Sequence, residues 1–285
     1  MPARIITVAN QKGGVGKTTT AVSLGAELAS RCRVLLIDLD PQANATSSLG
    51  CTDPEREQST YDVLLGNASL GEIILHTDIP NLDLAPADRV LAGAQIELVE
   101  FPDRERRLEQ PIQELTGLTD DAPAYDLILI DTPPSLGLLT LNALAVSDHV
   151  LIPVQSEYLA LEGLGQLVET LELVRGSLNP RLALIGIVLT MLDARTNLSV
   201  QVGNEVRKHF PAATFQTAIP RSVRLSEAPS YGRPIMLYDP SSRGARAYAE
   251  LADELAGRLG LSGSAVPSGR SGTSATPRAP KAETA

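Results

Sequence analysis

Residues 10–18 read NQKGGVGKT, and this stretch decides the fold. The apolar run Arg4–Asn10 leads into it with a strand pattern, and a helical pattern over Thr18–Ser30 follows it. Glycines allow the tight turn that points backbone N–H groups at phosphate oxygens, and the positive end of the helix dipole adds to this attraction. The order strand, glycine-rich loop, helix therefore predicts a phosphate-binding loop.

The phosphate-loop pattern predicts which side chains contact the nucleotide and the metal. Lys17 is expected to contact the β- and γ-phosphates of a nucleotide, and the Thr18 hydroxyl is expected to ligate Mg²⁺. The usual pattern would place its first glycine at position 11, but the chain has Gln11 there and a second lysine, Lys12, directly after it. The predicted nucleotide contacts are Lys12, Gly13, Gly14, Val15, Gly16, Lys17, Thr18 and Thr19.

Two further apolar runs end in carboxylates. LLIDLDPQANAT, residues 35–46, contains Asp38 and Asp40, and YDLILIDTPPSLG, residues 125–137, contains Asp131. Residues two apart on a strand point the same way, so Asp38 and Asp40 are both expected to face the phosphate loop. Asp131 ends its run in the manner of a Walker B aspartate and is expected to hold Mg²⁺ through water. Ser135 lacks the glycine pattern of a hydrolase nucleophile, which excludes that role.

The remaining chain alternates apolar runs with helical patterns. Runs without strict alternation suit strands buried on both faces of a parallel sheet. The predicted fold class is a doubly wound α/β domain, a mostly parallel sheet with helices on both faces as in P-loop NTPases. The predicted strands are Arg4–Asn10, Arg33–Asp40, Asp126–Asp131, His149–Val154 and Leu182–Thr190; the predicted helices are Thr18–Ser30, Ala87–Glu100, Pro102–Thr116, Leu159–Arg175, Asn197–Phe210 and Ser241–Leu259.

Composition indicates one domain over residues 1–261 and a disordered tail over 262–285, which is rich in Gly, Ser, Pro and Ala. The start passes straight into a strand pattern and no apolar run reaches the roughly 20 residues of a membrane helix, so we expect a cytoplasmic protein. Cys32 and Cys51 have no metal-ligand spacing, and two reduced structural cysteines are expected.

The charge is unevenly distributed. The formal net charge is −10, yet residues 175–246 contain ten basic and four acidic residues, a net of +6, which leaves −16 for the remainder. Such asymmetry permits an anion-binding face on an acidic body, although a solvated basic surface would give the same count.

KGGVGKTTT, residues 12–20, resembles the deviant Walker A motif of the ParA/MinD group of P-loop ATPases. The resemblance covers about Ile5–Leu259 and is closest to the small chromosomal ParA, or Soj-like, subfamily. It implies that Lys12 reaches across a homodimer interface to the phosphates held by the other subunit. It further implies that Asp38 supports the Mg²⁺ shell and that Asp40 positions or deprotonates the attacking water.

The resemblance also extends to the carboxyl-terminal half. No guanine-reading [NT]KxD motif occurs, so ATP is the expected nucleotide, and family analogy puts its adenine near Met191 and Pro220. Arg195 and Arg224, both inside the +6 segment, match family positions that bind double-stranded DNA without sequence preference. The implied function is an ATP-dependent partitioning switch that associates with the nucleoid and is released when a ParB-like centromere-binding partner stimulates ATP hydrolysis.

Three alternatives share the nucleotide motifs. A MinD-like ATPase that positions the division site at the membrane needs a carboxyl-terminal amphipathic helix, and the tail shows no such pattern, so no membrane partner is expected. A nitrogenase-reductase-like electron carrier needs cysteines after the later strands, where this chain has none. An amide-forming ligase needs a pocket for an acid substrate, which the sequence does not reveal.

Overall fold

A computed structural model describes residues 3–117, 125–157 and 160–261. Its centre is an eight-stranded sheet in the order β3-β4-β2-β5-β1-β6-β7-β8, and every neighbouring pair is parallel except β3 with β4. The strands are β1 (Arg4–Val8), β2 (Val34–Asp38), β3 (Leu75–His76), β4 (Leu82–Ala85), β5 (Leu127–Asp131), β6 (His149–Gln155), β7 (Ala183–Leu192) and β8 (Thr214–Pro220).

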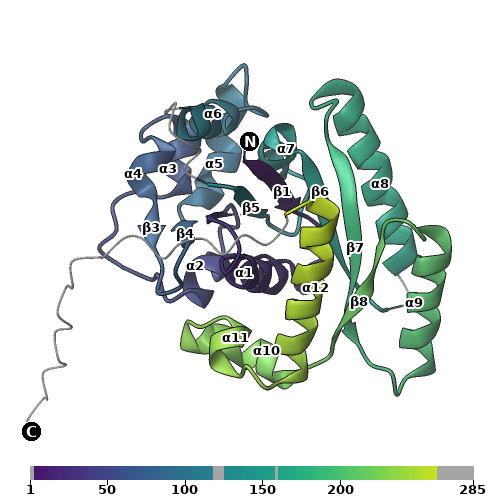
Figure 1. The fold of residues 1–285 in the computed structure, drawn as a ribbon. Coiled ribbons are helices and arrows are strands. Elements are labelled where there is room, and N and C mark those ends of the chain that lie inside the picture. The colour runs from purple at the N-terminus through teal and green to yellow at the C-terminus, as the bar shows by residue number, and fades with distance from the viewer. Residues whose placement is uncertain (1–2, 118–124, 158–159, 262–285) are drawn as a thin grey trace, which may run out of the picture.

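Helices cover both faces of this sheet (Figure 1). Helices α1 and α12 pack on one face, while α3, α5, α6, α7, α8 and α9 cover the other, so alternate residues of each central strand enter different hydrophobic clusters. The predicted doubly wound fold is confirmed. The helices are α1 (Lys17–Leu28), α2 (Asn44–Ser48), α3 (Thr60–Leu65), α4 (Leu70–Ile73), α5 (Leu91–Glu97), η1 (Leu98–Glu100), α6 (Glu109–Gly117), α7 (Leu138–Val146), α8 (Ala160–Ser177), α9 (Asn197–His209), α10 (Val223–Glu227), η2 (Ala228–Tyr231), α11 (Ile235–Tyr238) and α12 (Arg243–Leu259).

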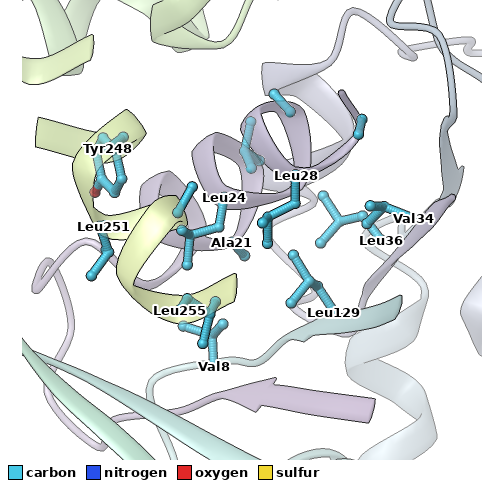
Figure 2. Close-up of a cluster of buried hydrophobic side chains, with 14 of the residues drawn as sticks. Val8, Ala21, Leu24, Leu28, Val34, Leu36, Leu129, Tyr248, Leu251 and Leu255 are labelled. Atoms are coloured by element: carbon cyan, nitrogen blue, oxygen red, sulfur yellow. The ribbon is translucent and has the colours of Figure 1, made fainter. Parts of the chain in front are cut away.

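The core under the nucleotide edge is aliphatic. Figure 2 shows Leu28 of α1 beside Leu129 of β5 and Leu255 of α12 beside Val8 of β1. All four side chains are fully buried, and each contributes roughly 1.5–3 kcal/mol by leaving water. This packing fixes α1, and with it the loop that precedes α1, on the sheet.

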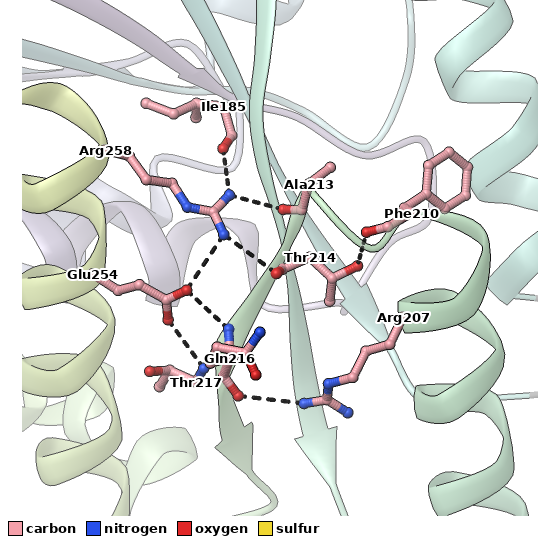
Figure 3. Close-up of polar contacts among 9 residues, drawn as sticks. All are labelled: Ile185, Arg207, Phe210, Ala213, Thr214, Gln216, Thr217, Glu254 and Arg258. Atoms are coloured by element: carbon pink, nitrogen blue, oxygen red, sulfur yellow. Dashed lines mark hydrogen bonds and ion pairs between the residues drawn. The ribbon is translucent and has the colours of Figure 1, made fainter.

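The outer pair of strands, β7 and β8, is irregular in register, and charged side chains of α12 bind its backbone (Figure 3). Arg258 donates hydrogen bonds to the carbonyl oxygens of Ile185 (2.7 Å) and Ala213 (2.9 Å) and lies over the Phe215 ring. Glu254 accepts from the backbone N–H groups of Gln216 (2.9 Å) and Thr217 (3.1 Å). The bonds from Gln216 and Thr217 pair backbone N–H groups at the first register shift between β7 and β8, and Arg258 binds the carbonyl groups just before that shift.

Several predicted boundaries are wrong. Strand β2 ends at Asp38, so Asp40 lies beyond the strand rather than on it. The predicted helix Pro102–Thr116 begins only at Glu109, because a turn in which the Arg106 N–H donates to the Asp103 carbonyl precedes it. The sequence patterns also did not predict β4, β8 or α7; α7 is apolar on all sides and gives no amphipathic signal.

Three further expectations concern the tail, membrane-spanning helices and the cysteines. The predicted disordered tail, 262–285, lies outside the described residues. Within those residues, no helix combines the length and hydropathy needed to cross a membrane. Both cysteines are free thiols, as expected, and burial raises the pKa of Cys32 to about 11.

Candidate nucleotide site

The predicted site residues meet where β1, β2 and β5 end. Backbone register pairs Asp131 with Val8 on one side and with Asp38 on the other. The glycine-rich loop follows β1, so the sheet places this loop beside Asp131, which lies between the loop and Asp38, at the edge where ligands of such folds bind. The proximity of the three motifs is therefore a consequence of strand order rather than of sequence distance.

The loop leads into an uncapped helix. Gly14 and Gly16 have φ angles of 71° and 88°, which L-residues with a side chain rarely adopt. Gly16 is the N-cap of α1, it provides no side-chain cap, and the first turn contains no acidic residue. The free N–H groups of this turn can therefore bind an anion. From β7, the Thr190 hydroxyl donates to the Val15 carbonyl (2.8 Å) and fixes the loop on a strand that β6 separates from β1.

The two lysines of the loop occupy different environments. Lys17 is buried, and its Nζ lies 3.3 Å from the carbonyl oxygen of Lys12. Burial lowers the pKa of Lys17, while Asp131 and Asp40 oppose this shift. The Lys12 side chain is 45% exposed, and its Nζ lies 2.5 Å from the carboxylate of Glu157, just beyond β6. Thus Lys17 faces the carboxylates of its own site, whereas Lys12 sits at the rim.

Asp38 is held rigidly. One of its carboxylate oxygens accepts from the Asp40 N–H (3.1 Å), and the other accepts from the N–H (2.9 Å) and hydroxyl (2.8 Å) of Thr46. Burial raises the pKa of Asp38, and the hydrogen bonds from Thr46 and Asp40 partly offset that rise. Asp38 therefore ties α2, which contains Thr46, to the nucleotide edge.

Asp131 is fully buried, and neither of its carboxylate oxygens has a hydrogen-bond partner among the described residues. Burial, followed by the nearby Asp38 carboxylate, raises the pKa of Asp131 well above its usual value, while Thr18 and Lys17 act in the opposite direction. An unpartnered buried carboxylate is costly unless a cation or its water shell meets it. The site thus fits Mg²⁺.

A closed protein cage for the metal is not present in the described part of the chain, where no three His, Cys, Asp or Glu side chains converge on one point. This suits Mg²⁺, which is usually bound by one or two carboxylates and fills the rest of its shell with water and phosphate oxygens. Asp131, Asp38 and the Thr18 hydroxyl are the residues that would hold it.

The other predicted nucleotide residues lie at the same edge. Asp40 is 6% exposed, accepts from the Gln42 N–H (2.9 Å) and acts on the pKa of Lys17, so it faces the site although it lies beyond β2. Met191, near the end of β7, has a φ of 51°, a backbone strain typical of functional positions. Pro220 is at the end of β8, where it pairs with Leu192. Adenine contact at Met191 and Pro220 remains a prediction.

The two predicted DNA-binding arginines follow β7 and β8. The Arg195 side chain is 87% exposed and forms two hydrogen bonds with Asp193, of 2.8 and 2.7 Å, which hold the pKa of Asp193 down at about 2. Arg224 on α10 contacts Glu227 (2.9 Å) and Asp239 (3.4 Å). Both guanidinium groups are therefore exposed but paired with carboxylates of their own subunit.

Three contributors were not predicted. Thr46 orients Asp38, Thr190 holds the phosphate loop and Glu157 pairs with Lys12. Each is separated in sequence from the residue that it contacts, by 8, 175 and 145 positions. Two of them could have been found from the sequence, because Thr190 is the polar end of one apolar run and Glu157 closely follows another, which ends at Val154.

Comparison with known proteins agrees with this geometry. A family model described as an AAA domain matches residues 3–184. The sporulation initiation inhibitor protein Soj of Bacillus subtilis is 56% identical over 254 residues, which cover 89% of this chain and 98% of Soj. The chromosome partitioning protein ParA of Caulobacter vibrioides is 49% identical over 259 residues, covering 90% of this chain and 95% of ParA.

Solved structures show the same fold. A Mycobacterium smegmatis structure named cobyrinic acid a,c-diamide synthase, with bound ADP and magnesium, has a TM-score of 0.78 at 38% identity and covers 90% of this chain and 96% of its own. The septum site-determining protein MinD of Pyrococcus horikoshii, complexed with Mg-ADP, has a TM-score of 0.72 at 27% identity, with coverage of 91% and 98%. On the motifs, the fold and these relatives together, the chain belongs to the ParA/MinD group of P-loop ATPases, close to the Soj-like chromosome partitioning ParA proteins.

Proposed function

We propose that this protein is an ATP-dependent chromosome or plasmid partitioning switch. In the proposed cycle, ATP and Mg²⁺ close a sandwich homodimer, and the dimer binds nucleoid DNA in the cytoplasm without sequence preference. A ParB-like centromere-bound partner stimulates hydrolysis and releases the dimer. The observation that carries the proposal is the different burial of the two lysines in the phosphate loop. Lys17 is buried within the site, and Lys12 is exposed at its rim.

The chemistry follows from the placement of the site residues. Water attacks the γ-phosphorus in line, its proton passes to the Asp40 carboxylate, and the bond to the β–γ bridging oxygen breaks to leave ADP. Lys17 and the N-terminus of α1 stabilise the phosphate charge, and Lys12 of a second subunit would add a further cation. Bound Mg²⁺ supplies charge neutralisation at the phosphate oxygens.

DNA binding is proposed for Arg195 and Arg224. The arginine side chains are 87% and 56% exposed, and ion pairs that are this accessible to water contribute only about 0–1 kcal/mol, so DNA phosphates can replace the carboxylates. Phosphate contacts of this kind give affinity without reading the base sequence. A dimer presents two such faces, so two weak contacts act as one stronger one.

The decisive experiment measures retention of mixed-sequence duplex DNA with ATP, with ADP and without nucleotide. We expect wild-type binding only with ATP, weakening as salt rises, and we expect Arg195→Glu to abolish it. Arg181→Glu is the matched control, because Arg181 is exposed two residues before β7 whereas Arg195 follows the other end of the same strand. Equal binding in every nucleotide state, or equal loss of binding in both variants, would contradict the proposal.

Two observations keep alternatives open to test. The MinD structure shares the fold, so ATP-dependent sedimentation with anionic phosphatidylglycerol vesicles in the absence of DNA would favour division-site positioning at a membrane. The M. smegmatis structure bears the name of a diamide synthase, so ATP-dependent amide formation from a carboxylic acid in the absence of DNA would favour a ligase. The much higher identity to Soj favours partitioning over both.

A further inference from the structure

The predicted metal site and the predicted DNA-binding arginine Arg224 are connected through a glycine–glycine contact between two loops. Gly50 follows α2, and Gly232 follows η2. A Cβ atom added at Gly232 would lie 3.0 Å from the Cα and 3.3 Å from the nitrogen of Gly50. A Cβ atom added at Gly50 would lie 3.2 Å from the Gly232 carbonyl oxygen. The two backbones thus meet so closely that a side chain at either glycine would push the other backbone by a few tenths of an ångström.

On one side, the contact leads to the nucleotide edge. Helix α2 contains Thr46, whose N–H and hydroxyl both bond Asp38. The same helix ends at Ser48, and the Gly50 N–H donates to the Ser47 carbonyl oxygen (3.0 Å), so Gly50 moves with α2. A change in the hydrogen bonds of Asp38 when Mg²⁺ and nucleotide bind therefore acts on α2 directly.

On the other side, the contact leads to Arg224. Helix α10, which contains Arg224 and ends at Glu227, runs without a break into η2, and Gly232 is the C-cap of η2. The Glu227 carboxylate accepts from Arg224 and from the Tyr238 hydroxyl (3.1 Å). A shift of η2 would move Glu227, and with it the carboxylate that occupies the Arg224 guanidinium.

The junction is closely packed elsewhere too. Helix α1, which begins at the phosphate loop, meets α10, η2 and α11 around a cavity of only about 10 Å³ lined by Thr19, Ser48, Leu225 and Arg233 among others. Closely packed interfaces of this kind shift between discrete arrangements rather than deforming continuously. The junction can therefore transmit a displacement of α2 to the α10–η2 segment.

We propose that the Gly50–Gly232 contact couples the occupancy of the nucleotide site to the availability of Arg224 for DNA. The coupling rests on the proposed function and adds the route by which ATP controls DNA affinity. In the described state Arg224 is held by Glu227 and Asp239. Nucleotide binding shifts α2, moves η2 through the glycine contact and releases the guanidinium to phosphate.

The test uses Gly232→Ala with Gly260→Ala as its control in the full chain. Both glycines have left-handed φ angles, of 61° and 67°, but a Cβ atom at Gly260 would have no neighbour within 4 Å. Both alanines therefore bear the same backbone strain, and only the one at position 232 disturbs the contact. Neither residue touches the predicted nucleotide or DNA, so basal ATP hydrolysis should stay at the wild-type rate in both.

Duplex affinity is measured with and without a non-hydrolysable ATP analogue, and analogue affinity with and without duplex. Each pair of measurements gives a ratio, the affinity for one ligand with the other ligand present divided by the affinity without it. Thermodynamic linkage requires this ratio to be the same for duplex and for analogue, and it is typically about 5- to 150-fold for coupled sites. We expect wild type and Gly260→Ala to show such a ratio and Gly232→Ala to lower both ratios by the same factor, while Arg195 and ATP-dependent dimerisation maintain the remainder. Gly50→Ala serves as the second variant if Gly232→Ala fails to fold by circular dichroism.

The outcomes separate the two proposals. A wild-type ratio of one would overturn the partitioning switch and the coupling with it. A normal wild-type ratio that persists in folded Gly232→Ala, or in Gly50→Ala, would overturn the coupling alone. An equal fall of the ratio in Gly260→Ala, or unfolding of both Gly50→Ala and Gly232→Ala, would make the contact a requirement of the fold and would also overturn it.

Discussion

At the scale of single residues, the loop NQKGGVGKT separates two lysines by environment. Lys17 lies buried against Asp40 and Asp131, where its charge offsets theirs. Lys12 is exposed and pairs with Glu157, and an exposed pair of this kind is weak enough to exchange for another anion. In the proposed dimer, the phosphates of the nucleotide bound to the second subunit would be such an anion, because they carry more charge than a single carboxylate.

Lys12→Ala should therefore separate nucleotide binding from dimer formation. We expect a fluorescent ATP analogue to bind the variant within a few-fold of wild type, because Lys17 and the N-terminus of α1 remain. ATP-dependent dimers, measured by analytical ultracentrifugation, should disappear. Glu157→Ala is the control, since it removes the same ion pair but keeps Lys12. Normal ATP-dependent dimers of Lys12→Ala would refute the role assigned to this lysine.

At the scale of elements, α12 holds an edge of the sheet that hydrogen bonds between strands leave incomplete. The register of β7 with β8 shifts twice, and Arg258 and Glu254 bind the backbone groups around those shifts. Phe215 fills the space beside Gly186, and Arg258 covers the ring of Phe215. This arrangement fixes β8, and therefore the start of the segment that contains Pro220 and Arg224.

Gly186→Ala should destabilise this edge. A Cβ atom there would lie 2.1 Å from Phe215 and 2.8 Å from Arg258, so both side chains must shift, at a cost of about 1–3 kcal/mol for overpacking. Gly257→Ala is the control, because a Cβ atom in that helical position meets nothing within 4 Å and should stabilise by up to about 1 kcal/mol. Urea unfolding measures both. Equal stability of the two variants would show that the edge adapts freely.

At the scale of the whole molecule, a net charge of −10 opposes association with DNA, while residues 175–246 carry +6. The structure places Arg195 beyond β7 and Arg224 beyond β8, and these strands are paired at Leu192 and Pro220. In the proposed complex these two arginines would therefore act from one end of the sheet, and the acidic remainder of the molecule would limit binding elsewhere. DNA affinity of this origin must depend steeply on salt.

Arg224→Ala should lower the slope of log affinity against log salt concentration by about 1 for each phosphate that the variant no longer binds. The affinity should fall equally for duplexes of unrelated sequence, because phosphate contacts carry no base information. Arg181→Ala, at the opposite end of β7, should leave the slope unchanged. Anisotropy titrations with the ATP analogue at several salt concentrations measure this. An unchanged slope for Arg224→Ala would remove this arginine from the DNA interface.

The fold class followed from the sequence because each decisive signal is local. The loop of residues 10–18, the apolar runs that end at Asp38 and Asp131 and the helical pattern after Thr18 each lie within one strand–turn–helix unit. Short or fully buried elements such as β4 and α7 were missed because they have neither the length nor the alternation of polarity that periodicity requires.

Tertiary structure alone decided how the distant residues meet. Parallel pairing of β2 with β5 set Asp38 beside Asp131, and the turn after β2 brought Asp40 into the site from outside the strand. The same packing joined Gly50 to Gly232. The sequence by itself determined the chemistry of the phosphate loop, because the glycines and lysines that form this loop lie within residues 10–18. Which groups share a site depends on packing between segments that are distant in the sequence, such as Lys12 and Glu157, 145 positions apart, and no local pattern records such contacts.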